Sequence, residues 1–151
     1  MFLAKAKLMK ASVKIAFAAS CILMVLGQTA AAKAAKVDYN ALAGESVNTV
    51  FFSSLMGWHA VDATATGLGP TQIVVQTGIK KAYLLTLYAP CRDLDFSVQI
   101  ALTSSGHQLS AGFDKILIPN RQSCRIKTIQ PINVKAMRAA EKAARLANKR
   151  T

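Results

Sequence analysis

The sequence predicts a mainly β domain: a small antiparallel barrel or curled sheet of about six strands, cross-linked by one disulfide and followed by a C-terminal solvated helix. Three observations predict this class: short β-rich runs bounded by turns, two cysteines within the β-rich region, and an Ala-rich basic segment after Pro131. The 151 residues suit one domain, and the 52% hydrophobic content argues against intrinsic disorder despite a net charge of +12. No apolar run reaches the length of a membrane span, which excludes a polytopic membrane protein.

The first 32 residues have the three parts of a secretory signal peptide. Four lysines and no acidic residue precede the apolar run 15–26, and small residues follow at 29–32. In a helix this run rises only ~18 Å, against the ~30 Å of a hydrocarbon core. We therefore expect cleavage after Ala32 or Ala30 and a periplasmic or secreted product, with an uncleaved anchor as the alternative. Cys21 lies inside the apolar run, whereas a lipid-modified cysteine would end it, so we expect Cys21 to leave with the signal.

Positive charge is concentrated in the tails of the expected mature chain. Removal of residues 1–32 leaves 15 basic residues against seven acidic ones, a net charge of about +8. The β domain, residues 37–133, has seven basic and six acidic residues, whereas the basic tail, residues 134–151, has six basic residues against Glu141. The basic residues of this tail are Lys135, Arg138, Lys142, Arg145, Lys149 and Arg150. They are the candidate contacts to an anionic surface.

Two cysteines, Cys91 and Cys124, remain after the expected cleavage. An even count in an exported domain predicts a disulfide, and two cysteines allow one intramolecular pairing. The chain-entropy model assigns such a loop about 3.5–4 kcal/mol of stabilisation. A redox pair or a metal site is the weaker alternative, because redox cysteines are usually two residues apart and two His with two Cys are few metal ligands.

Alternation of apolar and polar residues and short β-rich runs predict the strands. Residues 72–77 and 82–88 are a hairpin candidate with its turn at 78–81. Residues 96–103 alternate in period 2, which is typical of a half-buried strand, and Ser104-Ser105-Gly106 follows as a turn. Further strands are expected at residues 58–62, 115–118 and 124–129.

Two segments have helical character. Residues 39–56 mix helix formers with β-branched residues, which leaves helix or strand open. Residues 134–150 are Ala-rich, lack Gly and Pro, and space Arg138, Glu141 and Arg145 for i,i+3 and i,i+4 pairs. Since Val134, Met137 and Leu146 are the large apolar residues there, we expect a solvated helix that docks weakly.

Several runs together resemble a known family. They are Tyr83–Leu87 (YLLTL), Pro90–Leu94 (PCRDL), Phe113-Asp114, Cys124–Ile126 (CRI), Ile129 and Pro131. The chain resembles, over roughly Gly44 to Asn133 and including Trp58, the DUF6491-type family of small exported proteobacterial proteins of unknown function. Asn133 stands where the family pattern would have an acidic residue. The resemblance implies export and the disulfide but no activity, and the basic extension is interpreted as an addition of this protein.

The residue types that carry catalysis form no recognisable motif here. His59 and His107 are the two imidazoles, and no G-x-S-x-G elbow accompanies them; Ser104–His107 is interpreted as a polar turn. Asp93 and Asp95 could hold Ca²⁺ or act as an acid–base pair, but without a D-x-D-x-D-G loop turn capping is the preferred interpretation. For Asp114 a pair with Arg125 or a turn cap is expected.

We expect most aromatic residues to lie in the core, because so small a domain needs them there. These residues are Trp58, Tyr83, Tyr88, Phe96 and Phe113; a stacking platform for sugars or bases is the alternative, which stays open for Tyr88, on the strand face opposite Tyr83. We therefore predict a non-enzymatic exported β domain, a periplasmic binding or envelope-structural module of unknown ligand, without cofactor or metal. One alternative is an electrostatic adaptor whose basic tail attaches to an anionic envelope component; nucleic acid is not expected as a partner. A small periplasmic enzyme is the other alternative.

Overall fold

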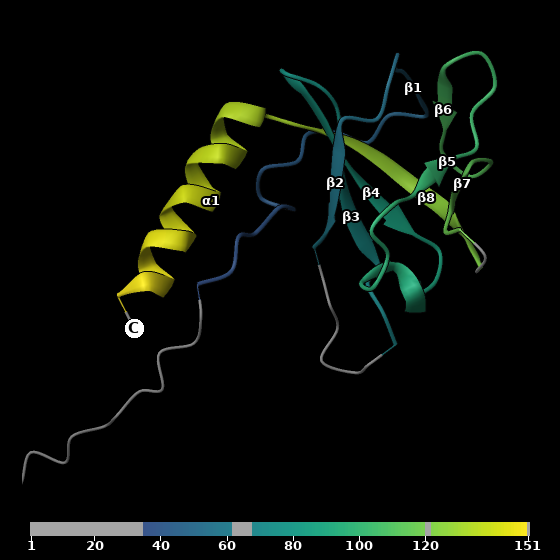
Figure 1. Cartoon of the computed structure of the whole chain (residues 1–151). Helices are drawn as coiled ribbons and strands as arrows, with labels where there is room; N and C mark the ends of the chain where they lie inside the picture. The colour runs from purple at the N-terminus through teal and green to yellow at the C-terminus, as the bar shows by residue number, and fades with distance from the viewer. Residues whose placement is uncertain (1–34, 62–67, 120–121, 151) are drawn as a thin grey trace, which may run out of the picture. The chain divides into compact units, whose positions relative to one another are not determined.

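A computed structural model of the chain describes residues 35–61, 68–119 and 122–150. The elements in these residues are β1 (Thr49–Phe51), β2 (Gly57–Ala60), β3 (Gln72–Gly78), β4 (Lys81–Leu87), the 3₁₀ helix η1 (Arg92–Leu94), β5 (Ala101–Leu102), β6 (Gln108–Ser110), β7 (Lys115–Leu117), β8 (Ser123–Ile132) and α1 (Val134–Lys149). Six of the described strands form one curled antiparallel sheet in the order β2-β3-β4-β8-β7-β5, and β1 pairs with β6 beside it (Figure 1). The predicted class is confirmed. The expected leader, residues 1–32 with Cys21, lies outside the described residues.

The predicted hairpin is confirmed as β3 and β4, which pair from Gln72 opposite Thr86 to Gly78 opposite Lys81. Successive side chains of a strand point to opposite faces, and here both faces are buried. One face contributes Ile73, Val75, Leu85 and Leu87 to one apolar cluster, and the other contributes Val74, Ala82 and Leu84 to a second. Burial on both sides explains why these strands are nearly continuous apolar runs in the sequence.

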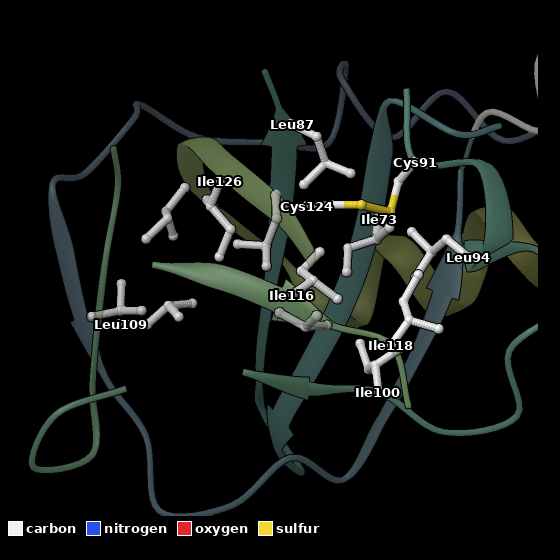
Figure 2. Packing of buried hydrophobic residues seen from close by; sticks show 14 residues of the cluster. Ile73, Leu87, Cys91, Leu94, Ile100, Leu109, Ile116, Ile118, Cys124 and Ile126 are labelled. Atoms are coloured by element: carbon white, nitrogen blue, oxygen red, sulfur yellow. A yellow bond between two sulfur atoms is a disulfide. The ribbon is translucent and has the colours of Figure 1, made fainter. Parts of the chain in front are cut away.

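The first cluster, which we call the disulfide-side core, also contains the cross-link. It consists of Val50, Ile73, Val75, Leu85, Leu87, Cys91, Leu94, Ile100, Leu109, Ile116, Ile118, Cys124, Ile126 and Ile129 (Figure 2). The predicted disulfide between Cys91 and Cys124 is confirmed, with the two Cα atoms 5.9 Å apart. Both cysteines are buried, so the bond connects the segment after β4 to the start of β8 from within the core.

The longest strand, β8, joins the two halves of the sheet because its first three residues pair with β7 and its remainder with β4. Leu87 pairs with Ile126 although the preceding residue of β4 pairs with Thr128, so Lys127 is an extra residue. Such a bulge bends its strand and reverses the alternation of side chains beyond it. The β8 side chains that share the disulfide-side core are therefore those of Cys124, Ile126 and Ile129.

The half-buried strand predicted over residues 96–103 is wrong for most of its length. Strand pairing is limited to Ala101 and Leu102, and a 3₁₀ helix with a following turn precedes it. Phe96 is 83% exposed and Val98 is 98% exposed, whereas Ile100 is buried. Local hydrogen bonds explain the turn: the Ser97 hydroxyl and amide donate to the carbonyls of residues 93 and 94. Polar side chains that bond nearby backbone in this way compete with strand pairing.

The segment that sequence analysis left open, residues 39–56, contains no helix. Single bridges at Ala43 and Val47 place its first part beside the end of β8, and β1 follows. The expected first strand, residues 58–62, is confirmed in essence as β2 at the edge of the sheet, although Asp62 lies outside the described residues. No helix of the described chain is long and apolar enough to cross a membrane.

The predicted C-terminal helix is confirmed as α1, and the side chain of Asn133 caps it by accepting a 3.1 Å hydrogen bond from the Ala136 amide. Its first turns cover the second face of the β3–β4 hairpin (Figure 1). This second cluster, which we call the helix-side core, consists of Tyr39, Val61, Val74, Ala82, Leu84, Ile132, Val134 and Met137. The sheet thus separates the two cores.

Candidate functional site

α1 packs against the domain at its first turns and makes single polar contacts further along. Val134 and Met137 are buried in the helix-side core. Near the other end, Asn148 accepts a 2.7 Å hydrogen bond from the Ala35 amide and donates one of 3.3 Å to the Ala35 carbonyl. Apart from these bonds the second half of the helix is largely exposed, as the few apolar residues of the helix predict.

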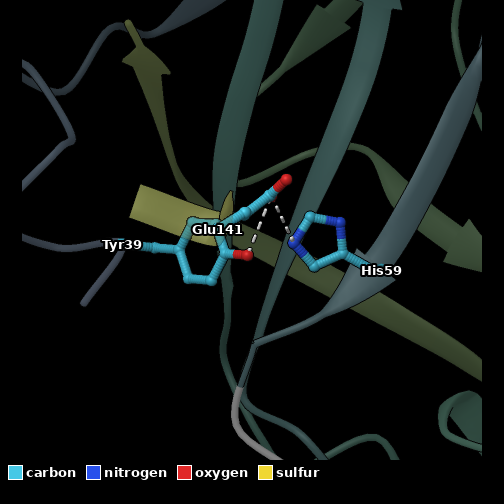
Figure 3. Close-up of polar contacts among 3 residues, drawn as sticks. All are labelled: Tyr39, His59 and Glu141. Carbon is cyan, nitrogen blue, oxygen red and sulfur yellow. Dashed lines mark hydrogen bonds and ion pairs between the residues drawn. The ribbon is translucent and has the colours of Figure 1, made fainter. Parts of the chain in front are cut away.

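Three polar side chains meet where α1 crosses the edge strand β2. The Tyr39 hydroxyl donates a 3.0 Å hydrogen bond to Oε1 of Glu141, and His59 Nε2 lies 4.0 Å from the same oxygen (Figure 3). The rings of Tyr39 and His59 are 5.2 Å apart between centroids. His59 Nε2 is buried and has no hydrogen-bond partner among the described residues. This trio joins the segment before β1 to β2 and to the middle of α1.

Burial shifts the protonation equilibria of the trio. The pKa of Tyr39 is raised from 10.0 to about 12, chiefly by burial and then by the hydrogen bond and negative charge of Glu141, while Arg145 acts in the opposite direction. Burial lowers the pKa of His59 below its usual 6.5, and the charge of Glu141 opposes that shift. Both shifts favour the neutral forms of the phenol and the imidazole.

Two hollows flank the trio, with volumes of about 430 and 260 Å³. Among the described residues that line them, none is a Ser, Thr or Cys that the imidazole could activate. The carboxylate already accepts the Tyr39 hydrogen bond. The arrangement links the helix to the domain and can accept or donate single hydrogen bonds.

Five basic residues of α1 share one exposed face, which we call the cationic face. It consists of Lys135, Arg138, Lys142, Arg145 and Lys149, all of them exposed. The spacing of three, four, three and four residues confines these side chains to roughly 80° of the helix circumference, over a length of ~21 Å. Arg150, also predicted as a contact, falls outside this arc by the same geometry. Glu141, the acid of this helix, belongs to the docked side through its bond to Tyr39.

The cationic face begins beside a hollow of about 650 Å³ between the β3–β4 turn and the start of α1. We call it the basic hollow; its lining residues are Ile79, Lys80, Ile132, Asn133, Val134, Lys135 and Arg138. Nη2 of Arg138 donates a 3.3 Å hydrogen bond to the Ile79 carbonyl, which connects the helix to the turn. The described lining contains three cations and no acidic residue.

The other predicted polar candidates have local structural positions. His107 follows Gly106 in the turn before β6, and the φ angles of the two are 62° and 61°, as in a tight hairpin turn. Asp93 lies in η1 and Asp95 follows it, which places both in a turn as expected. Asp114 caps a turn: its carboxylate accepts hydrogen bonds from the Ser110 amide at 2.6 Å and the Thr103 hydroxyl at 3.0 Å. In the described part of the chain no three His, Cys, Asp or Glu residues gather as metal ligands.

The expectation that most aromatic residues are core residues is wrong for two of them. Trp58 and Tyr83 pack against the disulfide-side core, whereas Phe96 and Phe113 are each 83% exposed. Both exposed residues lie in turns, where the backbone does not direct them inward. Tyr88, which was left open, is 59% exposed.

The family model of DUF6491, a family of unknown function, matches residues 9–148. The chain belongs to this family. The match continues past Asn133 through most of α1, so the interpretation of the basic extension as an addition of this protein is wrong. No curated protein and no solved structure matches the chain significantly.

Sequence reasoning found the basic residues but not their common face, nor Tyr39 and Lys80. The repeated spacing of three and four residues was a readable signal for the face once residues 134–150 were predicted to be helical. Tyr39 and Lys80 gave no such signal. Tyr39 bonds to the helix and Lys80 lines a hollow with it, although each is more than 50 residues away from it in the sequence.

Proposed function

We propose that this member of the family is an exported, non-enzymatic β domain that acts as a binding or structural module of the bacterial envelope. It attaches to an anionic envelope component through the cationic face of α1. The near-neutral β domain supplies a rigid support, and the attachment is electrostatic.

The observation that carries this proposal is the arrangement of five cations along one side of a docked helix. A flexible basic tail would present its charges in all directions, whereas α1 presents these five charges on one side of the helix. Each Lys or Arg near an anionic lipid surface contributes about 1 kcal/mol, and this attraction decays within a Debye length of ~8–10 Å. Binding through this face is therefore salt-sensitive.

Export is supported by the leader-like residues 1–32 and by the buried disulfide, since disulfides persist in oxidising compartments. Intact-mass spectrometry of protein from the native envelope tests it directly. We expect a chain that begins near Lys33 and takes up two alkyl groups only after reduction. A chain that retains Cys21 with an acyl group, or that carries free thiols on an uncleaved leader, contradicts this part of the proposal.

Attachment is tested by co-sedimentation of the exported chain with vesicles of phosphatidylcholine, with and without phosphatidylglycerol. We expect binding that requires phosphatidylglycerol, weakens with rising salt, and falls strongly in a variant with Lys142→Gln, Arg145→Gln and Lys149→Gln. These three side chains are exposed, so the variant should fold normally. Deletion of α1 is a poorer test, because it also removes Val134 and Met137 from the helix-side core.

The matched control removes three charges elsewhere, through Arg92→Gln, Arg125→Gln and Lys127→Gln. These residues are also exposed but belong to η1 and β8. If the control loses as much binding as the helix variant, net charge rather than the cationic face governs attachment. Vesicle binding that is unchanged in both variants overturns the proposed function.

A further inference from the structure

We infer that the basic hollow is a binding site for the phosphorylated headgroup of an anionic lipid. This inference rests on the proposed function and adds a specific pocket to it: the cationic face attracts the surface, and the hollow receives one headgroup together with the start of its acyl chains.

The basic hollow has an apolar base and a charged rim. Ile132 and Val134 line it and are 6% and 8% exposed, so the apolar residues at its base belong to the packed core. Lys80 lies in the turn between β3 and β4, whereas Lys135 and Arg138 belong to α1. The hydrogen bond from Arg138 to the Ile79 carbonyl holds these elements together.

Charge in the basic hollow is unbalanced in favour of an anion. Its described lining contains three cations, and Glu141, one turn after Arg138, is bonded to Tyr39 on the docked side of the helix. A phosphate group offers several acceptor oxygens, and ammonium and guanidinium groups supply matching donors. A phosphomonoester carries nearly two negative charges at neutral pH and suits three cations better than a single carboxylate does.

Ile79 indicates an amphiphile rather than a free phosphate. It lies in the turn between β3 and β4, is 69% exposed, and lines the same hollow as the three cations. An exposed apolar side chain surrounded by cations is typical of surfaces that enter the boundary between headgroups and acyl chains. A soluble phosphate would contact the cations and gain nothing from Ile79, whereas a lipid would contact both.

The test uses the exported, oxidised full-length product and the soluble short-chain lipid dihexanoyl phosphatidic acid below its micellar concentration. Binding is followed by amide chemical-shift changes in NMR titrations, with inorganic phosphate as the second ligand. The hollow variant combines Lys80→Gln, Lys135→Gln and Arg138→Gln. The matched variant combines Lys142→Gln, Arg145→Gln and Lys149→Gln, which removes equal charge from the far end of the cationic face.

We expect saturable binding of the lipid that the hollow variant weakens by about 100-fold and the matched variant by less than about threefold. Ile79→Ser should weaken lipid binding by about tenfold and leave binding of inorganic phosphate unchanged. All substituted side chains are exposed, so cooperative urea unfolding is expected to show that the variants are folded, with a small loss in the hollow variant from the Arg138 hydrogen bond.

Equal losses in the two triple variants overturn the hollow as a distinct site, even if vesicle binding through the cationic face persists. Equal affinity for inorganic phosphate and lipid, with no effect of Ile79→Ser, overturns the lipid and leaves a soluble phosphate as the ligand. The proposed function fails by a different result, namely vesicle binding that does not depend on the charges of α1.

Discussion

Tyr39 and Glu141 are 102 residues apart in the sequence, and the Tyr39 hydroxyl donates a 3.0 Å hydrogen bond to Oε1 of Glu141. Tyr39 is buried, and its ring also contacts that of His59. The bond fixes the rotation of α1 about its axis, because it holds the acid of the helix on the docked side. The five cations of the cationic face are exposed to solvent beside it.

Replacement of Tyr39 by Phe should destabilise the domain by about 1 kcal/mol, because the carboxylate loses a hydrogen bond in a partly desolvated position. The effect should be largest in α1, so hydrogen exchange of its amides should accelerate more than exchange in β3 and β4. Tyr88→Phe is the matched control, since Tyr88 is 59% exposed. Equal effects of the two substitutions on urea unfolding and on α1 exchange would show that the Tyr39–Glu141 bond does not hold the helix.

His59 should make folding stability decrease as the pH falls below 6.5. Burial lowers the pKa of this imidazole in the folded protein, so the unfolded chain takes up the proton first. The stability contributed by neutral His59 is present above pH 6.5 and is lost as the pH falls towards the folded-state pKa. Urea midpoints measured from about pH 8 to about pH 5 should decline less steeply in His59→Gln than in the wild type. Identical slopes in the two proteins would contradict the lowered pKa of this imidazole.

Tyr39 should affect stability in the opposite pH range. Its folded-state pKa is raised to about 12 from 10.0, so the stability that its neutral form contributes is complete below pH 10 and is lost as the pH rises from 10 towards 12. Spectrophotometric titration of the native protein should detect a tyrosine that ionises well above pH 10. In Tyr39→Phe this late-ionising group should be absent, and its persistence there would assign the shift to another tyrosine.

Elements whose structure is determined by residues adjacent in the sequence were predictable from the sequence. The β3–β4 hairpin carries its own turn, and the Ala-rich composition after Pro131 marks the start of α1. The Cys91–Cys124 disulfide was predictable from the number of cysteines, because the expected mature chain contains two and they can form one pair. Each of these predictions required information from one segment or from one residue type.

Features that depend on which segments meet were not predictable. Residues 96–103 alternate as a strand should, but alternation does not show whether a neighbouring strand is present to pair with them, and β7 meets only Ala101 and Leu102. The polar contacts of α1 were not predicted because their partners, Tyr39 and Ala35, lie about a hundred residues earlier. The basic hollow combines Lys80 with Lys135 and Arg138 for the same reason.

Loss of the disulfide should destabilise the domain by about 3–4 kcal/mol, the chain-entropy value for a separation of 33 residues. The double variant Cys91→Ala, Cys124→Ala tests this in urea unfolding, and the wild type in reductant is its control. Both should unfold at similar, lower urea concentrations than the oxidised wild type. An unchanged midpoint in the double variant would mean that the cross-link does not stabilise the domain.

Gly69→Ala should be strongly destabilising, whereas Gly57→Ala should be tolerated. Gly69 has a φ of +91°, and a Cβ atom there would contact the carbonyl group of Cys91, with the carbonyl carbon only 2.6 Å away. Relief of that contact must shift the backbone beside the buried disulfide, and the left-handed conformation adds strain of about 1–3 kcal/mol. A Cβ atom on Gly57 meets nothing within 4 Å, so alanine in this edge strand should change stability by less than about 1 kcal/mol. Urea unfolding of both oxidised variants measures the difference, and equal midpoints would show that the approach of Gly69 to Cys91 is not required by the fold.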